Sequence, residues 1–463
     1  MKLAIDQEKK IKQLFAKINS KDEFLQLLNY SKKIIYKEKT IPFTITQLNF
    51  YISKDSKEFN SSKKFYKKFE IKKKSGTPRT IHAPCKGLLE FQKSLNIILQ
   101  VIHTPHIAAT GFIPNKSIVD NAKKHVNKIY VYNIDLKDFF PSVDAARVWG
   151  RLTVAPFNLG TSDNRKQIAN MIKTLCCHTM KVERLDVDKK KWFKKEASVL
   201  PQGAATSPTL TNAICERMDI KLTGLANRFN LDYTRYADDI TFSSNHNTYK
   251  ITSEKEEAIF EKDTTFDIEL RRIIKEQNFH IKEAKVRLQK RGYRQEVTGL
   301  VVNDKINIKR SYIKSLRHNL YLWEKYGYDK AYELFLKRYL KEKGHTKKGN
   351  PNMMMVLEGK LLYLKMVKGE KDSTYRKFKE RFDKLTINPQ VEEAKKESRY
   401  SLKELRLKSD NAKKEPSITI AEFNRMISSA KARKESDKKD NINKILDIIF
   451  EKGLDEAMKL YDK

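Results

Sequence analysis

Two adjacent aspartates at a predicted hairpin tip constrain the fold of this chain most strongly. The string Tyr-Ala-Asp-Asp at 236–239 follows Tyr-Thr-Arg at 233–235 and precedes Ile-Thr-Phe at 240–242, and both flanks are rich in residues that favour strands. This pattern predicts a β-hairpin that presents Asp238 and Asp239 at its tip. Taken alone, the same string is also typical of a solvated acidic turn, so other segments must decide between the two interpretations.

A second acidic segment supports a functional site. Positions 129–135 (Ile-Tyr-Val-Tyr-Asn-Ile-Asp) predict a buried strand that ends in the carboxylate of Asp135. Only a folded sheet could bring Asp135 and Asp238 together. Phosphoryl transfer to a growing strand needs two divalent ions about 3.5–4 Å apart, held by carboxylates. We therefore predict that Asp135 and Asp238 bridge the ions and that Asp239 contributes more weakly.

The order of three segments resembles the successive palm motifs of reverse transcriptases. Asn-Ile-Asp-Leu-Lys-Asp-Phe-Phe occupies 133–140, Leu-Pro-Gln-Gly-Ala-Ala-Thr-Ser-Pro occupies 200–208, and Tyr-Ala-Asp-Asp occupies 236–239. Asn-Ala-Lys-Lys-His at 121–125 and Val-Thr-Gly at 297–299 are similar to two signatures of bacterial retron reverse transcriptases. The resemblance implies an α+β fold: a right-hand polymerase with fingers, palm and helical thumb, plus helical N- and C-terminal segments.

Periodicity and composition divide the chain into four predicted regions. Residues 1–60 form a helical N-terminal segment, 61–310 the interleaved fingers and palm, 311–385 a helical, RNA-binding thumb, and 386–463 a basic C-terminal extension. We interpret the extension as a segment that docks a partner or contacts RNA, with a solvated appendage as the alternative. Part of it predicts a short amphipathic helix whose apolar face consists of Ile442, Ile445, Leu446 and Ile449.

The resemblance implies further contacts to metal and triphosphate. In the reverse transcriptase pattern, the backbone carbonyl of Leu136 can bind a metal ion. Arg79 lies in a basic segment, 64–85, whose Ser-Gly-Thr-Pro centre predicts a hairpin tip. This hairpin corresponds to the mobile fingers, where Arg79, and less strongly Lys72, would grip the triphosphate. An exposed hairpin that touches template phosphates is the alternative.

Three more residues complete the predicted nucleotide site. In the family pattern, an aromatic residue at the position of Phe140 packs beneath the incoming sugar and leaves no room for a 2′-hydroxyl, so deoxynucleotides are the expected substrates. Phe139 is the better core candidate, because successive strand residues face opposite ways. Gln202 precedes small residues that let the backbone approach the nascent base pair. Lys285 resembles a lysine near the leaving pyrophosphate, with an uninvolved surface lysine as the alternative.

The two retron signatures imply contacts with structured RNA. Asn121 and His125 are four residues apart, so a helix would place them on one face, where they either contact RNA or serve as hydrogen-bonded packing residues. Val297, Thr298 and Gly299 begin a segment that predicts a strand reaching the nucleic-acid cleft. Gly299 would let another backbone pass close by.

A predicted thumb helix supplies two further RNA-binding candidates. Lys314 and Arg317 lie away from its apolar stripe and would be free to bind phosphates. The stripe, which would pack on neighbouring helices, consists of Ile313, Leu316, Leu320 and Trp323.

Composition agrees with a polyanionic partner. Lys and Arg number 95 against 58 Asp and Glu, a formal net charge of +37 in 463 residues. The first residues lack the apolar run of a signal peptide, and no segment approaches the ~20 apolar residues of a membrane span. We therefore expect a soluble, cytoplasmic protein with no membrane partner. The four cysteines fit neither a disulfide framework nor a zinc clamp, and we interpret Cys176, Cys177 and His178 as part of a helix packed on the palm.

These observations predict an RNA-directed DNA polymerase that uses two Mg²⁺ ions and deoxynucleoside triphosphates. The retron resemblance further implies priming from a 2′-hydroxyl of its own structured noncoding RNA, a branched RNA–DNA product, and antiphage defence with an effector protein. A group II intron-type enzyme is the nearer alternative, although the tail carries no Cys or His cluster for a metal-binding endonuclease. A non-catalytic RNA-binding scaffold is the other, and three acids in a cleft for polyanions argue against it.

Overall fold

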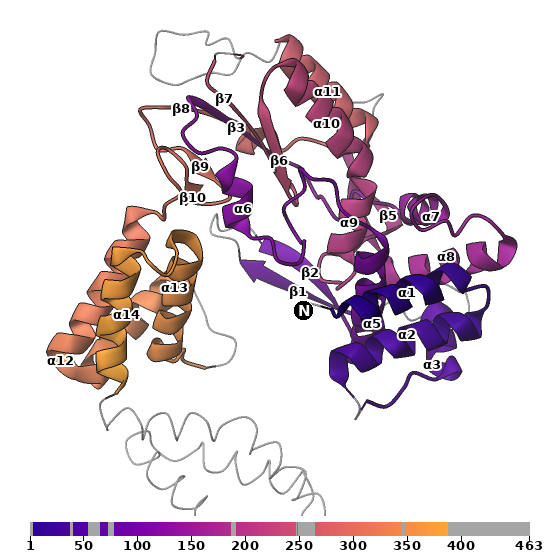
Figure 1. The fold of residues 1–463 in the computed structure, drawn as a ribbon, viewed down its shortest axis with the longest axis horizontal. Helices are drawn as coiled ribbons and strands as arrows, with labels where there is room; N and C mark the ends of the chain where they lie inside the picture. Colours follow the sequence, from indigo (N-terminus) through magenta and orange to yellow (C-terminus); the bar gives the residue numbers. More distant parts are fainter. Residues whose placement is uncertain are drawn as a thin grey trace, which may run out of the picture. The chain divides into compact units, whose positions relative to one another are not determined.

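The computed structural model describes residues 3–37, 40–53, 65–72, 78–186, 191–246, 248, 264–343 and 349–387. The chain divides into two compact units, Met1–Lys379 and Glu380–Lys463. Helices and strands are mixed along the first unit (Figure 1), which confirms the predicted α+β class. The tip of the predicted fingers hairpin at 73–77, the side chain of Lys72 and the predicted amphipathic helix of the C-terminal extension lie outside what the structure describes.

The N-terminal segment is helical, as predicted, and its helices begin at residues that satisfy free backbone amides. The hydroxyl of Ser20 accepts a hydrogen bond from the amide of Glu23, and Thr44 and Gln47 form a reciprocal capping box. Their apolar faces pack on a long fingers helix, with the rings of Phe43 and Phe91 stacked at 3.7 Å. These helices are α1 (Ile5–Lys17), α2 (Lys21–Tyr36), α3 (Ile45–Ile52) and α5 (Lys86–Ile102).

The fingers hairpin consists of β1 (Tyr66–Lys72) and β2 (Pro78–Pro84), which pair antiparallel. Its second strand rests on the loop that contains the second palm motif, because the amide of His82 donates to the carbonyl of Gln202 at 2.9 Å. Gly203 allows this approach, since a Cβ there would lie 2.6 Å from the carbonyl oxygen of His82.

A four-stranded antiparallel sheet in the order β6-β7-β3-β8 forms the palm. The first five residues of its central strand β3 are buried, as expected for a strand covered on both faces. On one face, Phe266 packs edge-on against Tyr132 and Phe242, and Figure 1 shows α10 and α11 beside this sheet. The strands and the two helices are β3 (Tyr130–Asp135), β6 (Asp232–Tyr236), β7 (Asp239–Ser244), β8 (Arg287–Lys290), α10 (Glu216–Arg228) and α11 (Thr265–Glu276).

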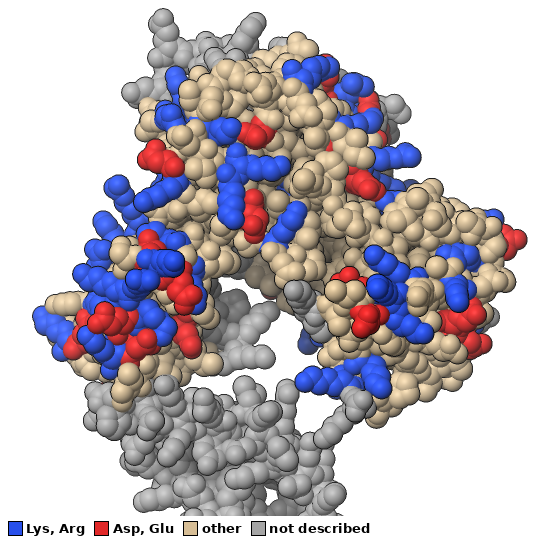
Figure 2. Space-filling view, in the orientation of Figure 1, with Lys and Arg blue, Asp and Glu red and all other residues tan. Residues whose placement is uncertain are grey.

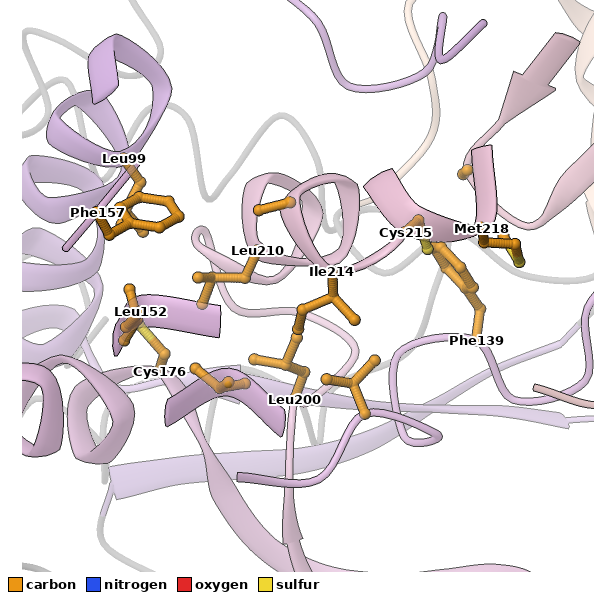
Figure 3. Close-up of a cluster of buried hydrophobic side chains, with 14 of the residues drawn as sticks. Leu99, Phe139, Leu152, Phe157, Cys176, Leu200, Leu210, Ile214, Cys215 and Met218 are labelled. Carbon is orange, nitrogen blue, oxygen red and sulfur yellow. The ribbon is translucent and has the colours of Figure 1, made fainter. Parts of the chain in front are cut away.

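One continuous apolar core joins the palm to the fingers helices. Figure 3 shows Cys176 and Cys215 within it, beside leucine and phenylalanine side chains from several elements. Cys176 ends a helix and is fully buried, which confirms helix packing for this residue, whereas Cys177 follows the helix and His178 begins a strand. The remaining elements of this part are α6 (Ile118–Lys123), α7 (Ala145–Thr153), α8 (Asp163–Cys176), β4 (His178–Asp186), β5 (Lys191–Val199), α9 (Ser207–Ile214) and the 3₁₀ helix Glu283–Lys285.

The predicted thumb is helical. Its first helix is interrupted at Gly327, which has φ 75° and ψ 173°. Leu316, Leu320 and Trp323 are buried, as the apolar stripe predicts.

On the face drawn in Figure 2, Lys and Arg side chains outnumber Asp and Glu. Within the described ranges, no helix combines the length and apolar composition needed to cross a bilayer. The last elements are β9 (Glu296–Val297), β10 (Leu300–Val301), α12 (Arg310–Lys343), α13 (Met353–Lys368) and α14 (Ser373–Thr386).

Candidate active site

The predicted acidic hairpin is present, and it places the two aspartates differently. Tyr236 pairs with Asp239 across the two strands, so only Ala237 and Asp238 lie in the turn. Ala237 takes φ 57°, a left-handed conformation that tight hairpin turns require. Asp238 is therefore the tip residue, whereas Asp239 is the first residue of β7.

The sheet brings Asp135 to the same place. Asp135 ends β3 directly opposite Asp239, and the amide of the next residue, Leu136, donates to the carbonyl of Asp238 at 2.9 Å. Asp135 thus meets the adjacent pair Asp238 and Asp239, from which it is widely separated in sequence, at one end of the palm sheet. The metal-binding role of the Leu136 carbonyl stays a prediction.

The electrostatics of the cluster favour an added cation. Burial, and then the charge of Asp135, raise the pKa of Asp238. Burial, followed by the charges of Asp238 and Asp135, raises the pKa of Asp239 to about 7. Close carboxylates disfavour one another's charged forms. Lys285 forms an ion pair with Asp135, so an ammonium group already compensates one of the three acids.

The donor set fits a hard divalent cation. Among the described residues, no group of three or more His, Cys, Asp or Glu side chains is arranged to hold a metal ion by itself. In phosphoryl-transfer sites Mg²⁺ keeps several waters and combines one or two carboxylates with substrate phosphates, so it needs no complete set of protein ligands. Asp135, Asp238 and Asp239 offer only oxygen ligands and excess negative charge. They fit such an ion by their chemistry, without forming a complete protein cage.

A buried ion pair positions the turn. Arg235, which is fully buried, donates from Nε and Nη2 to the two carboxylate oxygens of Asp219, at 2.8 and 2.6 Å. Its Nη1 donates to the carbonyl of Ala237 at 3.1 Å, and the Tyr233 hydroxyl donates to Asp219 at 2.8 Å. Burial alone would lower the pKa of Arg235, but Asp219 raises it above its usual value. The guanidinium therefore stays charged and holds the residue that precedes Asp238.

A neighbouring segment packs against the same turn. The amide of Thr110 donates to the carbonyl of Arg235, and the amide of Arg235 donates to the carbonyl of Ala108, both at 2.8 Å. A Cβ on Gly111 would lie 2.6 Å from the backbone nitrogen of Ala237. The turn therefore has a backbone neighbour too close for any side chain at residue 111.

Asn121 and His125 belong to this supporting layer. Both are fully buried. The Oδ1 of Asn121 accepts from the hydroxyl of Thr110 at 2.7 Å, and the two ring nitrogens of His125 lie 2.7 Å from the hydroxyls of Ser243 and Thr234. Direct contact with RNA is contradicted for both side chains, because protein surrounds them. They are hydrogen-bonded packing residues of the palm.

The predicted nucleotide residues lie around the cluster. Arg79 is exposed on β2, and its charge lowers the pKa of Asp238, so it lies near the acids. Phe139 is buried against Phe279, with ring centroids 5.6 Å apart, while Phe140 is half-buried. Gln202 is half-buried and receives the fingers hairpin on its carbonyl. The backbone amide of Lys282, three residues before Lys285, donates a hydrogen bond to the carbonyl of Asp135 at 2.8 Å and so joins this segment to β3.

The Val-Thr-Gly segment is a tight hairpin. Val297 pairs with Leu300, and Thr298 and Gly299 form the turn with φ 47° and 83°. The predicted continuous strand is therefore wrong, because both turn residues take left-handed conformations. Val297 is fully buried, which contradicts a side-chain contact with RNA. The RNA-binding roles of Thr298 and Gly299 stay predictions.

Lys314 and Arg317 are exposed on α12, as predicted. The guanidinium of Arg317 lies 5.9 Å from the ring of Phe378, which restricts one side of it. Their contact with RNA phosphates stays a prediction.

Sequence reasoning missed Arg235, Asp219 and Gly111. Arg235 stands directly before the acidic motif, and a cation in a predicted strand at that position was a usable signal. Nothing in the local sequence of Asp219 or Gly111 indicates that either contacts this turn.

We predict that Asp219→Asn lowers the free energy of unfolding by about 3–5 kcal/mol, because it leaves the Arg235 charge buried without a counter-charge. Urea denaturation measures the change. Asp232→Asn, in the strand that contains Arg235, is the matched control, because its ion pair with Lys128 is partly exposed and should contribute at most about 1 kcal/mol. Equal losses in the two variants would contradict the role of the buried pair.

We predict that His125 makes stability fall with acid. Burial, then Lys124 and Lys128, lower its pKa to about 3. Below the unfolded-state pKa of His125, about 6.5, its imidazole is protonated in the unfolded chain but stays neutral in the folded chain. The free energy of unfolding therefore falls as pH drops. Between pH 7 and 5, the wild type should lose about 2 kcal/mol more than His125→Asn in urea denaturation. Other histidines are common to both proteins and cancel; identical pH dependence would refute the assignment.

Residues 71–300 match the family described as reverse transcriptase (RNA-dependent DNA polymerase). The retron Mx65 reverse transcriptase of Myxococcus xanthus is 34% identical over 259 residues, 55% of this chain and 55% of that protein. The retron Ec86 reverse transcriptase of Escherichia coli is 29% identical over 261 residues, 55% of this chain and 69% of that protein. The chain thus spans about half the length of the first curated relatives it matches.

Solved structures are more distant. Telomerase from Candida albicans, solved with a fragment of telomeric RNA, has a TM-score of 0.35 at 9% identity and covers 76% of this chain and 66% of its own, a likeness that carries no argument. The palm motifs, the family match and the curated relatives agree with one another. Residues 71–300 therefore form a reverse transcriptase domain, and the curated proteins that it resembles are bacterial retron reverse transcriptases.

Proposed function

We propose that this chain is an RNA-directed DNA polymerase of retron type, which copies its own structured noncoding RNA into DNA. The meeting of Asp135, Asp238 and Asp239 at one end of the palm sheet carries the proposal. Basic residues dominate the composition, as expected for a protein that binds RNA and its DNA copy.

The three aspartates would hold two Mg²⁺ ions, together with the carbonyl of Leu136. Bound there, the ions would activate the attacking hydroxyl and neutralise the leaving pyrophosphate. The chain's own cations would bind the triphosphate. Lys285, which pairs with Asp135, would neutralise charge near the pyrophosphate, and Arg79 would bind the triphosphate from the fingers; the ion pair and the effect of Arg79 on the pKa of Asp238 support these roles.

The half-buried ring of Phe140 would pack beneath the incoming sugar and exclude a 2′-hydroxyl, so the substrates would be deoxynucleoside triphosphates. Gln202 would line the same pocket. Exposed Lys314 and Arg317 would bind RNA phosphates in a thumb over 311–385, and Thr298 and Gly299 would approach the nucleic acid.

The curated relatives are named retron reverse transcriptases, which supports the retron type in this proposal. The enzyme would prime from a 2′-hydroxyl of its RNA, leave a branched RNA–DNA product, and act in the cytoplasm in antiphage defence with an effector protein. A group II intron-like enzyme would instead give unbranched DNA. A non-catalytic scaffold would have no use for three clustered acids at a polyanion site, where burial and mutual repulsion raise the pKa values of Asp238 and Asp239.

We predict that Arg79→Ala raises the KM for deoxynucleoside triphosphates about tenfold or more, because a charge-assisted hydrogen bond is lost. Steady-state primer extension on an RNA template measures KM and kcat. Lys68→Ala is the matched control, since Arg79 lies opposite residue 71 and Lys68 therefore faces the other side of the hairpin. If both substitutions raised KM equally, Arg79 would be only part of a general basic surface.

We predict that protein purified from cells expressing its native locus carries DNA covalently joined to RNA. A variant with Asp238→Asn and Asp239→Asn should lack this product, because the substitutions remove two negative charges from the metal site. Ribonuclease and debranching treatment, followed by gel electrophoresis, identify the linkage. RNA alone from both proteins would favour the scaffold, and unbranched DNA from the wild type would favour another reverse transcriptase class.

A further inference from the structure

An exposed phenylalanine lies beside the candidate site, and no motif accounts for it. Phe112 is 40% exposed. Its ring centroid lies 6.0 Å from that of Phe140 and 6.4 Å from that of Tyr236, the residue that begins the catalytic turn. Both neighbouring rings are half-buried. The three rings therefore form one partly exposed aromatic surface next to Asp238.

The backbone at Phe112 is strained. Its φ is 62°, in the left-handed region that favours Gly or Asn and costs other residues about 1–2 kcal/mol. Gly111 is fixed on one side by its closeness to Ala237, and its carbonyl accepts a hydrogen bond from Asn212 at 2.9 Å. The anchored backbone thus aims the ring at Phe140. Stability alone does not explain an exposed aromatic side chain at a position where a smaller residue would be less strained.

We propose that Phe112 is a positioning residue for sugar selection: it packs against the Phe140 ring and holds it where it excludes the 2′-hydroxyl of an incoming nucleotide. This rests on the proposed function of Phe140. The Phe140 ring also touches Phe139, at 5.4 Å between centroids, and Phe139 is anchored in the core. Phe139 thus supports the ring from the core, and Phe112 supports it beside the turn.

The test is the ratio of kcat/KM for a deoxynucleotide to that for the matching ribonucleotide, in primer extension on RNA. Phe112→Ala and Phe112→Asn both remove the ring, and Asn tolerates the left-handed backbone, so at least one variant keeps the fold. We expect the ratio to fall about threefold to tenfold, the range that aromatic pair contacts support. Phe112→Tyr keeps the ring and should retain the wild-type ratio.

A double-mutant cycle separates action through Phe140 from independent contact. Phe140→Ala should lower the ratio more than Phe112→Ala, and adding Phe112→Ala to it should change the ratio no further. Two results would overturn the inference: an unchanged ratio in both Phe112→Ala and Phe112→Asn, or a fall on adding Phe112→Ala to Phe140→Ala that equals its fall in the wild-type background. If the wild type still copied RNA into DNA, the proposed function would stand in either case. Failure of the wild type to incorporate either nucleotide would reject the proposed function and this inference together.

Discussion

The buried pair between Arg235 and Asp219 is the interaction on which the catalytic end of the palm depends. Two charges removed from water are tolerated only when each keeps its partner and its remaining hydrogen bonds are made. Asp219 comes from α10, Arg235 from β6, and the third contact reaches the carbonyl of Ala237 in the turn. Because none of these groups can move without leaving a buried charge unpaired, the helix, the strand and the turn keep one arrangement. The position of Asp238 follows from a neutral pair that itself takes no part in chemistry.

Unlike the buried pair, the three carboxylates on the other side of the turn are not fully neutralised by nearby cations. Asp135, Asp238 and Asp239 repel one another, and nearby cations only partly offset the effect: Arg287 and Lys285 lower the pKa of Asp239, while Lys285 and Arg79 lower that of Asp238. A site that binds divalent ions and a triphosphate needs this residual negative charge beside movable cations. The rigid pair behind the turn and the uncompensated acids in front of it are therefore complementary parts of one site.

The sequence pattern predicted features that depend on neighbouring residues, and it did not predict contacts between distant segments. The strand flanks identified the acidic hairpin. Phe139 is buried and Phe140 half-buried, as predicted, although both lie in a turn beyond β3, where strand alternation does not apply. The predicted helix that carries both Asn121 and His125 was wrong in extent, because α6 ends at Lys123 and His125 lies in the turn that follows. Nor does a sequence show what covers such residues; here His125 bonds to the palm sheet and Asn121 to Thr110. The contact of Gly111 with Ala237 joins segments far apart in the chain, so no local signal could have revealed it. The prediction of a continuous strand at Val-Thr-Gly was wrong for a different reason: Thr is an uncommon residue at a left-handed turn position, so the sequence did not indicate a turn there.

The nucleotide residues are also placed by one shared set of contacts. Gln92 is fully buried on α5; its amide nitrogen donates to the Tyr66 hydroxyl of β1 and to the carbonyl of Leu175, and its Oε1 accepts from the amide of Ala205 at 3.3 Å. The fingers hairpin and the loop containing Gln202 are thus held by the same side chain, and the bond from His82 to Gln202 joins them again. Arg79 and Gln202 lie on these two elements. A shift of the hairpin base would move both, so we expect the hairpin and this loop to move as one unit relative to the turn that Arg235 holds.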